Sequence, residues 1–225
     1  MTYRGEEYDF GDPNQFIDNP EQRTPCIVMC DTSTSMAGGR IEQLNRGLHA
    51  LVRAVSSDSL TLSRVELAIG QFGNTVGLAH PFATADRIRV PTLVAHGSTP
   101  MGAAMTLAAD TVTARAKEYR KAGIACLVPL VFLISDGEPN DDWKGPAQRI
   151  AEMERKKQLA LFPIGVDGAD IKMMSSIGER PALMLRSANF LELFQWMGEL
   201  LCQYSMSRPG DKVQVPAPTW AEVRT

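Results

Sequence analysis

The residues best suited to chemistry lie in the stretch 26–36, where an apolar run stops at a carboxylate. Asp31 ends the run, and hydroxyl side chains then occupy every position through Ser35. One carboxylate beside several hydroxyls provides hard oxygen ligands, which suit a small cation such as Mg2+. The alternative is an ordinary turn, because Asp, Ser and Thr are common in turns.

The segments around this stretch predict a strand, an oxygen-rich loop and a helix, in that order. A short apolar run that ends in polar residues indicates a buried strand that leads into a loop. Across residues 41–52 the apolar positions recur at helical spacing. Ligands of open parallel sheets bind outside the carboxyl ends of the strands, where such loops lie. The loop is therefore expected at a ligand-binding edge.

The remaining chain alternates strands with helices, which predicts an α/β fold. Residues 75–82 follow the turn signal Gly73-Asn74 and should return as an antiparallel edge strand. Other strands are expected over 64–72, 127–135, 159–166 and 182–185, and other helices over 100–122, 146–157, 171–176 and 189–204. We predict one Rossmann-like, doubly wound domain, with a mostly parallel central sheet, one antiparallel edge strand and helices on both faces.

Two further loops adjoin these elements. Pro100 suits the first helical position, which makes Thr99 the N-cap, and Gly123 fits the C-cap of the same helix. Asp136 opens an acidic, turn-rich loop after the apolar run 127–135. Taken alone, helix capping and turn formation are sufficient to explain Thr99 and Asp136.

The three loops together resemble the metal-ion-dependent adhesion site (MIDAS) of von Willebrand factor A (vWA) domains. The first motif is Asp31-x-Ser33-x-Ser35, followed in the family's order by Thr99 and Asp136, and the resemblance covers roughly residues 24–204. It implies the vWA fold. It also implies that these five residues bind Mg2+, with Mn2+ as an alternative, directly or through water. The bound ion would then attract an Asp or Glu carboxylate from a protein partner.

Within this family the sequence is most similar to the bacterial TerY-like (tellurite-resistance-associated) branch. The similarity rests on Asp-Thr-Ser-x-Ser-Met, Ser-Thr-Pro-Met-Gly, Ile-Ser-Asp-Gly-Glu-Pro and Arg-Pro-Gly-Asp-Lys-Val-Gln-Val-Pro-x-Pro. It implies a role in a tellurite or chemical-stress response assembly, with a Ser/Thr kinase and a PP2C-type phosphatase as partners. Thr34 departs from the pattern, because Gly is frequent there, and should stiffen the loop. The Cys-rich metal-binding domain of some relatives does not occur in this chain.

The two ends of the chain differ from its centre. Residues 1–24 form a polar arm with six acidic residues and two arginines. The resemblance implies that residues 25–204 form the vWA domain. Residues 205–225 form a Pro-rich tail, which should run extended over the surface with Trp220 as its anchor.

Composition and cysteine spacing bear on the possible partners, the location and the state of the thiols. The net charge of −3 gives no general electrostatic reason to bind nucleic acid or an anionic membrane. No run approaches the roughly 20 apolar residues of a membrane helix, and the start of the chain carries no export segment, so we expect a cytoplasmic protein. Cys26 and Cys30 would lie about 13 Å apart on one strand, too far for a disulfide. We expect all four cysteines to be free thiols.

These features favour a binding module and predict that the chain is not an enzyme. The first alternative is a metal-dependent hydrolase or phosphatase with Asp31 as nucleophile. Haloacid-dehalogenase-type phosphatases, however, carry a second Asp where this chain has Ser33, and the three histidines are isolated in the sequence. The second alternative is a vWA scaffold without functional metal binding.

Overall fold

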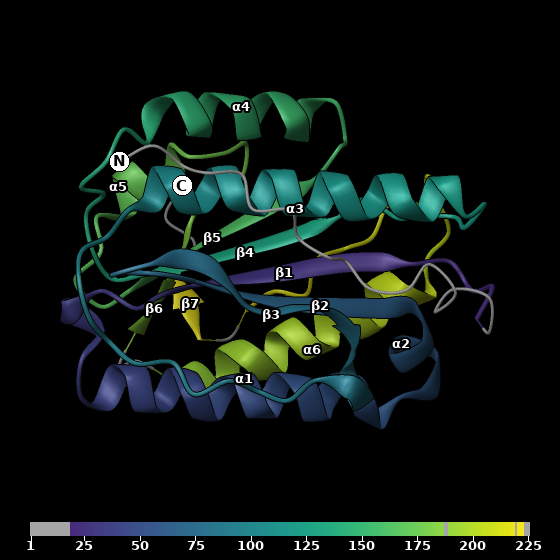
Figure 1. Ribbon diagram of the computed structural model, residues 1–225, viewed down its shortest axis with the longest axis horizontal. Coiled ribbons are helices and arrows are strands. Elements are labelled where there is room, and N and C mark those ends of the chain that lie inside the picture. Colours follow the sequence, from purple (N-terminus) through teal and green to yellow (C-terminus); the bar gives the residue numbers. More distant parts are fainter. Residues whose placement is uncertain (1–18, 187–188, 219, 223–225) are drawn as a thin grey trace.

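A single twisted sheet forms the centre of the computed structural model, which describes residues 19–186, 189–218 and 220–222 (Figure 1). Within these residues the sheet has six strands of three residues or more and a seventh of two residues, in the order β3-β2-β1-β4-β5-β6-β7. The strands are β1 (Thr24–Asp31), β2 (Val65–Phe72), β3 (Val76–Thr84), β4 (Leu130–Ser135), β5 (Ala160–Val166), β6 (Leu183–Leu185) and β7 (Ala221–Glu222).

The central strands are buried on both faces. Every residue of β1, β4 and β5 is buried, which explains why their sequences are continuous apolar runs rather than alternating patterns. Strand β1 pairs in parallel with β4, and β4 pairs in parallel with β5. The parallel sheet continues to β2 beside β1 and to β6 beside β5. At one edge β3 pairs antiparallel with β2, and at the other edge β7 pairs antiparallel with β6.

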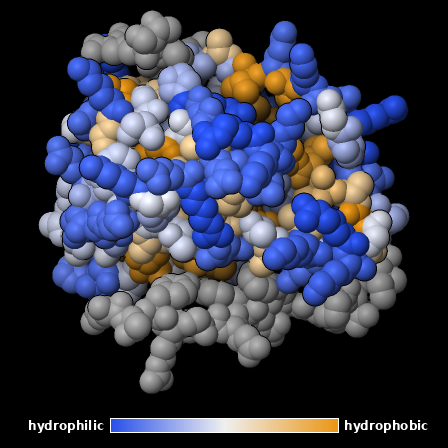
Figure 2. Space-filling view, turned by 90° about the horizontal axis from the view of Figure 1, so that it is seen from above, coloured by the Kyte–Doolittle hydropathy of each residue, from blue (hydrophilic) through white to orange (hydrophobic). Residues whose placement is uncertain are grey.

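Helices cover the sheet on both faces (Figure 1). Helices α3 and α4 lie on one face, and α1 and α6 lie on the other, each over its own apolar core. The α-helices are α1 (Gly39–Ser57), α2 (Ser59–Arg64), α3 (Met101–Lys121), α4 (Lys144–Arg155), α5 (Ile171–Ser175) and α6 (Phe190–Met206), and the 3-10 turns are η2 (Thr34–Met36) and η3 (Ala85–Arg87). Figure 2 looks onto the α3 and α4 side and shows a mainly hydrophilic surface with small, separate hydrophobic areas.

This architecture confirms the predicted α/β class, the doubly wound arrangement and the antiparallel edge strand β3. The two-residue strand β7 adds an antiparallel pair at the opposite edge, which the sequence pattern did not indicate. No helix among the described residues is long and apolar enough to cross a membrane. All four cysteines are free; Cys26 and Cys30 are buried, and Cys126 and Cys202 are half-buried.

The start of α3 differs from the prediction. The helix begins at Met101, and its N-cap is Pro100, which offers no side-chain acceptor. The prediction of Thr99 as N-cap was therefore wrong. At the other end the C-cap is Ala122 rather than Gly123, and Gly123 follows with φ +72°.

The C-terminal tail is anchored on α6. The Trp220 ring meets the Trp196 ring edge-on with 5.6 Å between centroids, and the Trp196 indole N–H donates to the Pro216 carbonyl at 2.8 Å. These contacts confirm the anchoring role predicted for Trp220. Residues 1–18, which make up most of the predicted polar arm, lie outside the described residues.

Candidate metal centre

The first and third loops meet because β1 and β4 are parallel neighbours. Cys30 lies opposite Ile134, so Asp31 and Ser135 come next to each other at the carboxyl ends of the two strands. The Ser135 hydroxyl donates a hydrogen bond to Asp31 Oδ2. The residue after Ser135 is Asp136, so strand register alone brings the two predicted carboxylates to one edge of the sheet.

A chain of hydrogen bonds links the predicted ligands. The Ser33 and Ser35 hydroxyl oxygens lie 2.9 Å apart, and the Ser35 hydroxyl donates to Asp136 Oδ1 at 2.6 Å. Thr99 faces the same point, because a Cβ placed on Gly137 would lie 3.1 Å from Thr99 Oγ1 and 3.8 Å from Ser35 Oγ. The structure therefore gathers all five residues that the sequence singled out.

Backbone hydrogen bonds fasten the first loop to the second. The His96 N–H donates to the Thr32 carbonyl at 2.7 Å, and the Thr34 N–H donates to the Gly97 carbonyl at 3.0 Å. The Thr34 hydroxyl donates to the same carbonyl at 3.0 Å. Thr34, the departure from the family pattern, thus ties the first loop to the segment that carries Thr99.

The third loop is fastened to the second and to the start of α3. The Asn140 N–H donates to the Thr99 carbonyl at 3.1 Å. The Asp141 carboxylate accepts from the Gly102 and Ala103 N–H groups at 2.9 and 2.8 Å. A carboxylate at this position satisfies free N–H groups of the first turn and interacts favourably with the helix dipole. Asp141 performs the capping that was predicted for Thr99.

Asp31 is fully buried at this edge. Its Oδ1 accepts from the Ser33 N–H at 2.7 Å, while Oδ2 accepts from Ser135. Burial raises the pKa of the Asp31 carboxyl, and the negative charge of Asp136 raises it further; the hydrogen bonds from Ser135 and Ser33 oppose this shift without cancelling it. A cation nearby would counter both of the effects that raise this pKa.

Arg40, in the first turn of α1, supplies a positive charge at the site. Its guanidinium forms an ion pair with Asp136 Oδ2, whose side chain is fully buried. The same guanidinium donates to the Ser35 carbonyl at 3.2 Å and to the Asp167 carbonyl at 2.9 Å. Arg40 thereby connects the loops that follow β1, β4 and β5.

Three side chains that contact the candidate site were not predicted from the sequence: Ser135, Arg40 and Asp141. Ser135 carried a usable signal, because it precedes Asp136 at the end of a strand expected to be parallel to β1. Asp141 stood in the predicted acidic loop, but its partners lie 39 and 38 residues earlier in the chain. Arg40 gave no local signal, since its partner Asp136 lies 96 residues away.

The site combines two carboxylates with three hydroxyls. Among the described residues no three His, Cys, Asp or Glu side chains converge on one point. A metal at this edge would therefore depend on Ser and Thr oxygens as well as carboxylates. This set of donors suits a hard cation such as Mg2+, and the guanidinium on Asp136 shows that the site accommodates positive charge.

The sequence matches the family model of the von Willebrand factor type A domain over residues 27–197. No curated protein matches the sequence significantly.

Solved structures share the fold at low sequence identity. One is proximal thread matrix protein 1 from the mussel byssus, with a zinc-occupied MIDAS motif (TM-score 0.55, 16% identity, 82% of this chain and 49% of that chain). Another is the ArnB paralog VWA2 from Sulfolobus acidocaldarius (0.55, 17%, 80% and 45%). A third is the vWF domain of the type V pili tip protein Mfa5 from Porphyromonas gingivalis (0.61, 11%, 85% and 99%). The chain spans about half the length of the mussel and Sulfolobus proteins.

Proposed function

Because the chain belongs to the von Willebrand factor type A domain family, we propose that it is a divalent-metal-dependent protein-interaction module. Domains of this family carry metal sites and mediate protein–protein interactions. The observation that supports the proposal most is the hydrogen-bonded chain from Ser33 through Ser35 to Asp136, with Thr99 beside it. Three loops far apart in the sequence converge there on a single set of oxygen donors.

Asp31, Ser33, Ser35, Thr99 and Asp136 would hold the ion, which we propose to be Mg2+, with Mn2+ as the alternative. A bound divalent ion supplies a Lewis-acidic position for an outside oxygen. The protein fixes the donors beforehand. The Ser33 N–H and the Ser135 hydroxyl orient the Asp31 carboxylate, and the ties between the loops keep the hydroxyls close to Asp136.

The charge of the donor set points to an Asp or Glu side chain as the partner's contribution. Two carboxylates balance a divalent cation, and hydroxyls add no charge. One further anionic oxygen is then attracted by the ion, and a carboxylate matches hard-cation chemistry. The partner is therefore proposed to be a protein that presents an exposed carboxylate.

We propose binding rather than catalysis. Both Asp31 carboxylate oxygens already accept hydrogen bonds, one from the Ser33 N–H and one from Ser135, which makes Asp31 a poor nucleophile. Incubation with a generic phosphoester in Mg2+ or Mn2+ checks this point. Turnover that is abolished by Asp31→Ala would establish the hydrolase alternative.

One observation favours a second candidate function, that of a vWA scaffold without functional metal binding. The Arg40 guanidinium already pairs with Asp136 and bridges to the Ser35 and Asp167 carbonyls. An internal cation in this position could substitute for a metal ion and hold the loops together by itself. Metal affinity separates the two candidates.

A setting in a bacterial tellurite or chemical-stress assembly, with a kinase and a PP2C-type phosphatase, is also part of the proposal. It is supported by the loop motifs and the tail motif of the TerY-like branch. A cytoplasmic location stays a prediction from the sequence.

Calorimetric titration with Mg2+ and Mn2+ tests the proposal directly. Wild-type protein should bind one ion, and Thr99→Ala should bind it more weakly. Thr113→Ala, which removes a hydroxyl from a later turn of α3, is the matched control and should titrate like wild type. Absence of binding in all three proteins would support the scaffold.

A pull-down then tests the interaction itself. The protein should capture its partner in Mg2+ but not in chelator, and Asp31→Ala should capture it in neither. Capture that is identical with and without Mg2+ would contradict a metal-mediated contact.

A further inference from the structure

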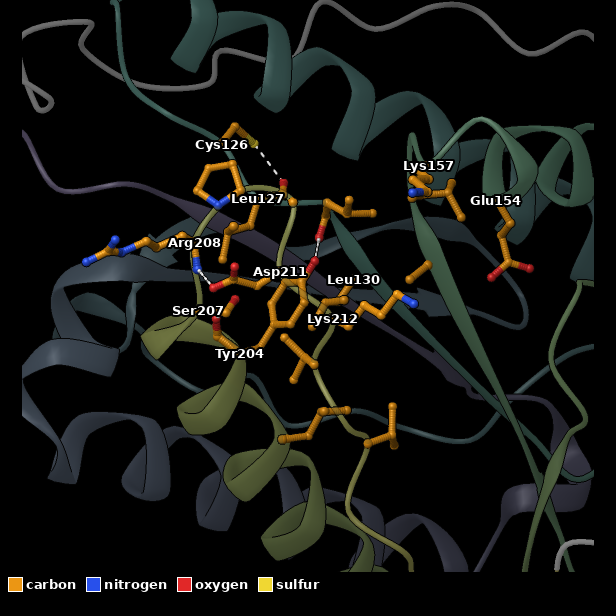
Figure 3. A pocket seen from close by; sticks show the side chains of 18 of the residues that line it. Cys126, Leu127, Leu130, Glu154, Lys157, Tyr204, Ser207, Arg208, Asp211 and Lys212 are labelled. Carbon is orange, nitrogen blue, oxygen red and sulfur yellow. Dashed lines mark hydrogen bonds between the residues drawn. The ribbon is translucent and has the colours of Figure 1, made fainter.

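A pocket of about 510 Å³ lies at the opposite edge of the sheet, near the amino ends of β4 and β5 (Figure 3). Its walls come from the start of these strands, the C-terminal ends of α4 and α6, and residues 207–215, which we call the strap. The candidate metal centre lies at the carboxyl ends of the same strands. The pocket is therefore separate from the metal centre.

The strap is fixed at both ends and crosses the pocket between them. At its start the Gln22 side chain donates to the Ser207 carbonyl. Just beyond its end the Trp196 indole donates to the Pro216 carbonyl at 2.8 Å. A tight turn follows Ser207, with Gly210 at φ +97° and an Asp211 N–H···O bond to Arg208 of 3.0 Å. The strap is thus an ordered wall rather than a loose end.

The floor of the pocket is apolar. It is formed by Leu127, Leu130, Leu159, Phe162, Leu200 and Tyr204. The Tyr204 hydroxyl donates to the Val128 carbonyl at 3.1 Å, which leaves its ring as a mainly apolar surface. The leucines and Phe162 are already buried beneath the strap, so the apolar area that a ligand would remove from water belongs mainly to Tyr204 and to Val213 and Val215 of the strap.

The one buried carboxylate of the pocket is fully engaged. Glu154 accepts from the Leu161 N–H at 2.9 Å and from the Glu179 N–H at 2.7 Å. It also forms an ion pair with Arg180, whose guanidinium lies 5.2 Å from the Phe162 ring centroid. The charges of Glu154 and Arg180 therefore offset each other.

Two lysines at the pocket lack such a partner. Lys157 follows the end of α4, and Lys212 belongs to the strap. Neither forms an ion pair with any carboxylate among the side chains that the structure describes. In Figure 3 the Lys212 side chain extends from the strap toward the side where Lys157 and Glu154 lie. The lining also contains the cation Arg208 and the carboxylate Asp211, so four cationic side chains face two carboxylates, and the pocket combines an apolar floor with an excess of positive charge.

We propose that this pocket binds a small organic carboxylate with an apolar body. The carboxylate is recognised by Lys157 and Lys212, and the body covers the floor beneath the strap. The volume lies within the range of roughly 300–1,000 Å³ that small-molecule sites occupy, and such sites combine apolar walls with a few polar groups. An inorganic anion would use the lysines but leave the exposed apolar area of Tyr204, Val213 and Val215 in water, whereas an uncharged apolar molecule would leave the lysines unmatched.

Titration with decanoate, in chelator and below its micelle concentration, tests the proposal independently of the metal centre. We expect calorimetric binding to wild type, with chemical-shift changes at Leu127, Phe162 and Tyr204. The double variant K157Q/K212Q should bind about tenfold more weakly, because two ammonium groups no longer attract the carboxylate. Lys144→Gln, at the other end of α4, is the matched control and should bind like wild type.

Two further probes separate the parts of the ligand. Acetate, which has the charge without the body, and decyltrimethylammonium, which has the body with the opposite charge, should each bind much more weakly than decanoate. Thermal unfolding verifies that K157Q/K212Q is folded. The proposal is overturned if wild type does not bind decanoate, if the double variant binds it equally well, or if the ammonium probe binds as tightly.

Discussion

The two edges of one sheet carry opposite chemistry. Strand β4 begins at Leu130, on the apolar floor of the strap pocket, and ends at Ser135, which contacts Asp31 in the candidate metal centre. The carboxyl edge collects carboxylates and hydroxyls, whereas the amino edge collects lysines above apolar side chains. A six-residue strand therefore connects a site suited to cations with a site suited to anions. In a parallel sheet, strand direction assigns each loop to one edge and so keeps the two chemistries apart.

The edges also differ in how they are held. At the carboxyl edge, backbone hydrogen bonds join Thr32 to His96 and Thr34 to Gly97, and Asp141 caps α3. At the amino edge, the strap depends on side-chain contacts near its two ends, from Gln22 and Trp196. The loops of the carboxyl edge are thus joined to one another by backbone hydrogen bonds, whereas the pocket at the amino edge has one wall that is attached through side chains.

The largest effect is expected from Asp31→Ala, which removes a buried carboxylate from the carboxyl edge. Mg2+ affinity should fall about 100-fold or more, equivalent to about 2.7 kcal/mol, because half of the compensating negative charge is lost. Calorimetric titration with Mg2+ measures this loss of affinity. Asp211→Ala removes a carboxylate from the amino edge instead and should leave Mg2+ affinity unchanged. Equal losses in both variants would show that overall charge, not the local site, governs the binding of the ion.

Gly102→Ala tests the fixed geometry of the carboxyl edge. A Cβ at Gly102 would lie 2.2 Å from the Asp142 carbonyl oxygen and 3.0 Å from Trp143 Cα, so the third loop would have to move away from α3. We expect the free energy of unfolding to fall by about 1–3 kcal/mol, measured by urea unfolding in chelator.

Gly145→Ala is the control for this experiment. Nothing lies within 4 Å of a Cβ at Gly145, which is also helical. This variant should be as stable as wild type, or more stable by up to about 1 kcal/mol, because Ala favours helix over Gly. Comparable losses in both variants would mean that the close approach at Gly102 does not constrain the loop.

Most of the fold was predictable from local sequence patterns, whereas the five residues of the candidate site were identified through the resemblance of three loops to the vWA motif. The apolar runs of β1, β4 and β5 identify buried strands, and parallel strands bring Asp31 and Asp136 to one edge whatever lies between them. The features that were not predicted depend on contacts between residues far apart in the sequence. The capping of α3 by Asp141 and the pairing of Arg40 with Asp136 join loops that no spacing rule connects. The two-residue strand β7 likewise forms only because the tail returns to β6.

Arg40→Gln tests whether the Arg40 guanidinium competes with the proposed metal ion for Asp136. The guanidinium shares Asp136 with the proposed ion and repels it, so removing its charge should raise Mg2+ affinity by about tenfold. Arg46→Gln, on the same helix and paired only with the exposed Glu42 among the described residues, is the matched control and should not change the affinity. Lower affinity in Arg40→Gln would instead show that Arg40 organises the donors rather than competing with the ion.

The smallest effect concerns the closure of the amino edge and is tested by Tyr204→Phe. Burial raises the pKa of the Tyr204 phenol from its ordinary value of 10.0 to about 12, so the folded protein retains this proton more strongly than the unfolded chain does. At neutral pH the variant should be about 1 kcal/mol less stable, because it lacks the hydrogen bond to Val128.

The same raised pKa sets how this difference depends on pH. The stabilisation by Tyr204 is fully present below pH 10 and should be lost as the pH rises towards 12, since ionisation then favours the unfolded chain. Urea unfolding at several alkaline pH values measures how the stability advantage of wild type over the variant is lost. The absorbance difference between wild type and variant at alkaline pH follows the phenolate directly. An ordinary titration of Tyr204 near pH 10 would show that water reaches the phenol freely. The amino edge would then be more open to solvent than the strap pocket in Figure 3, and the contrast between the two edges would rest on their charges alone.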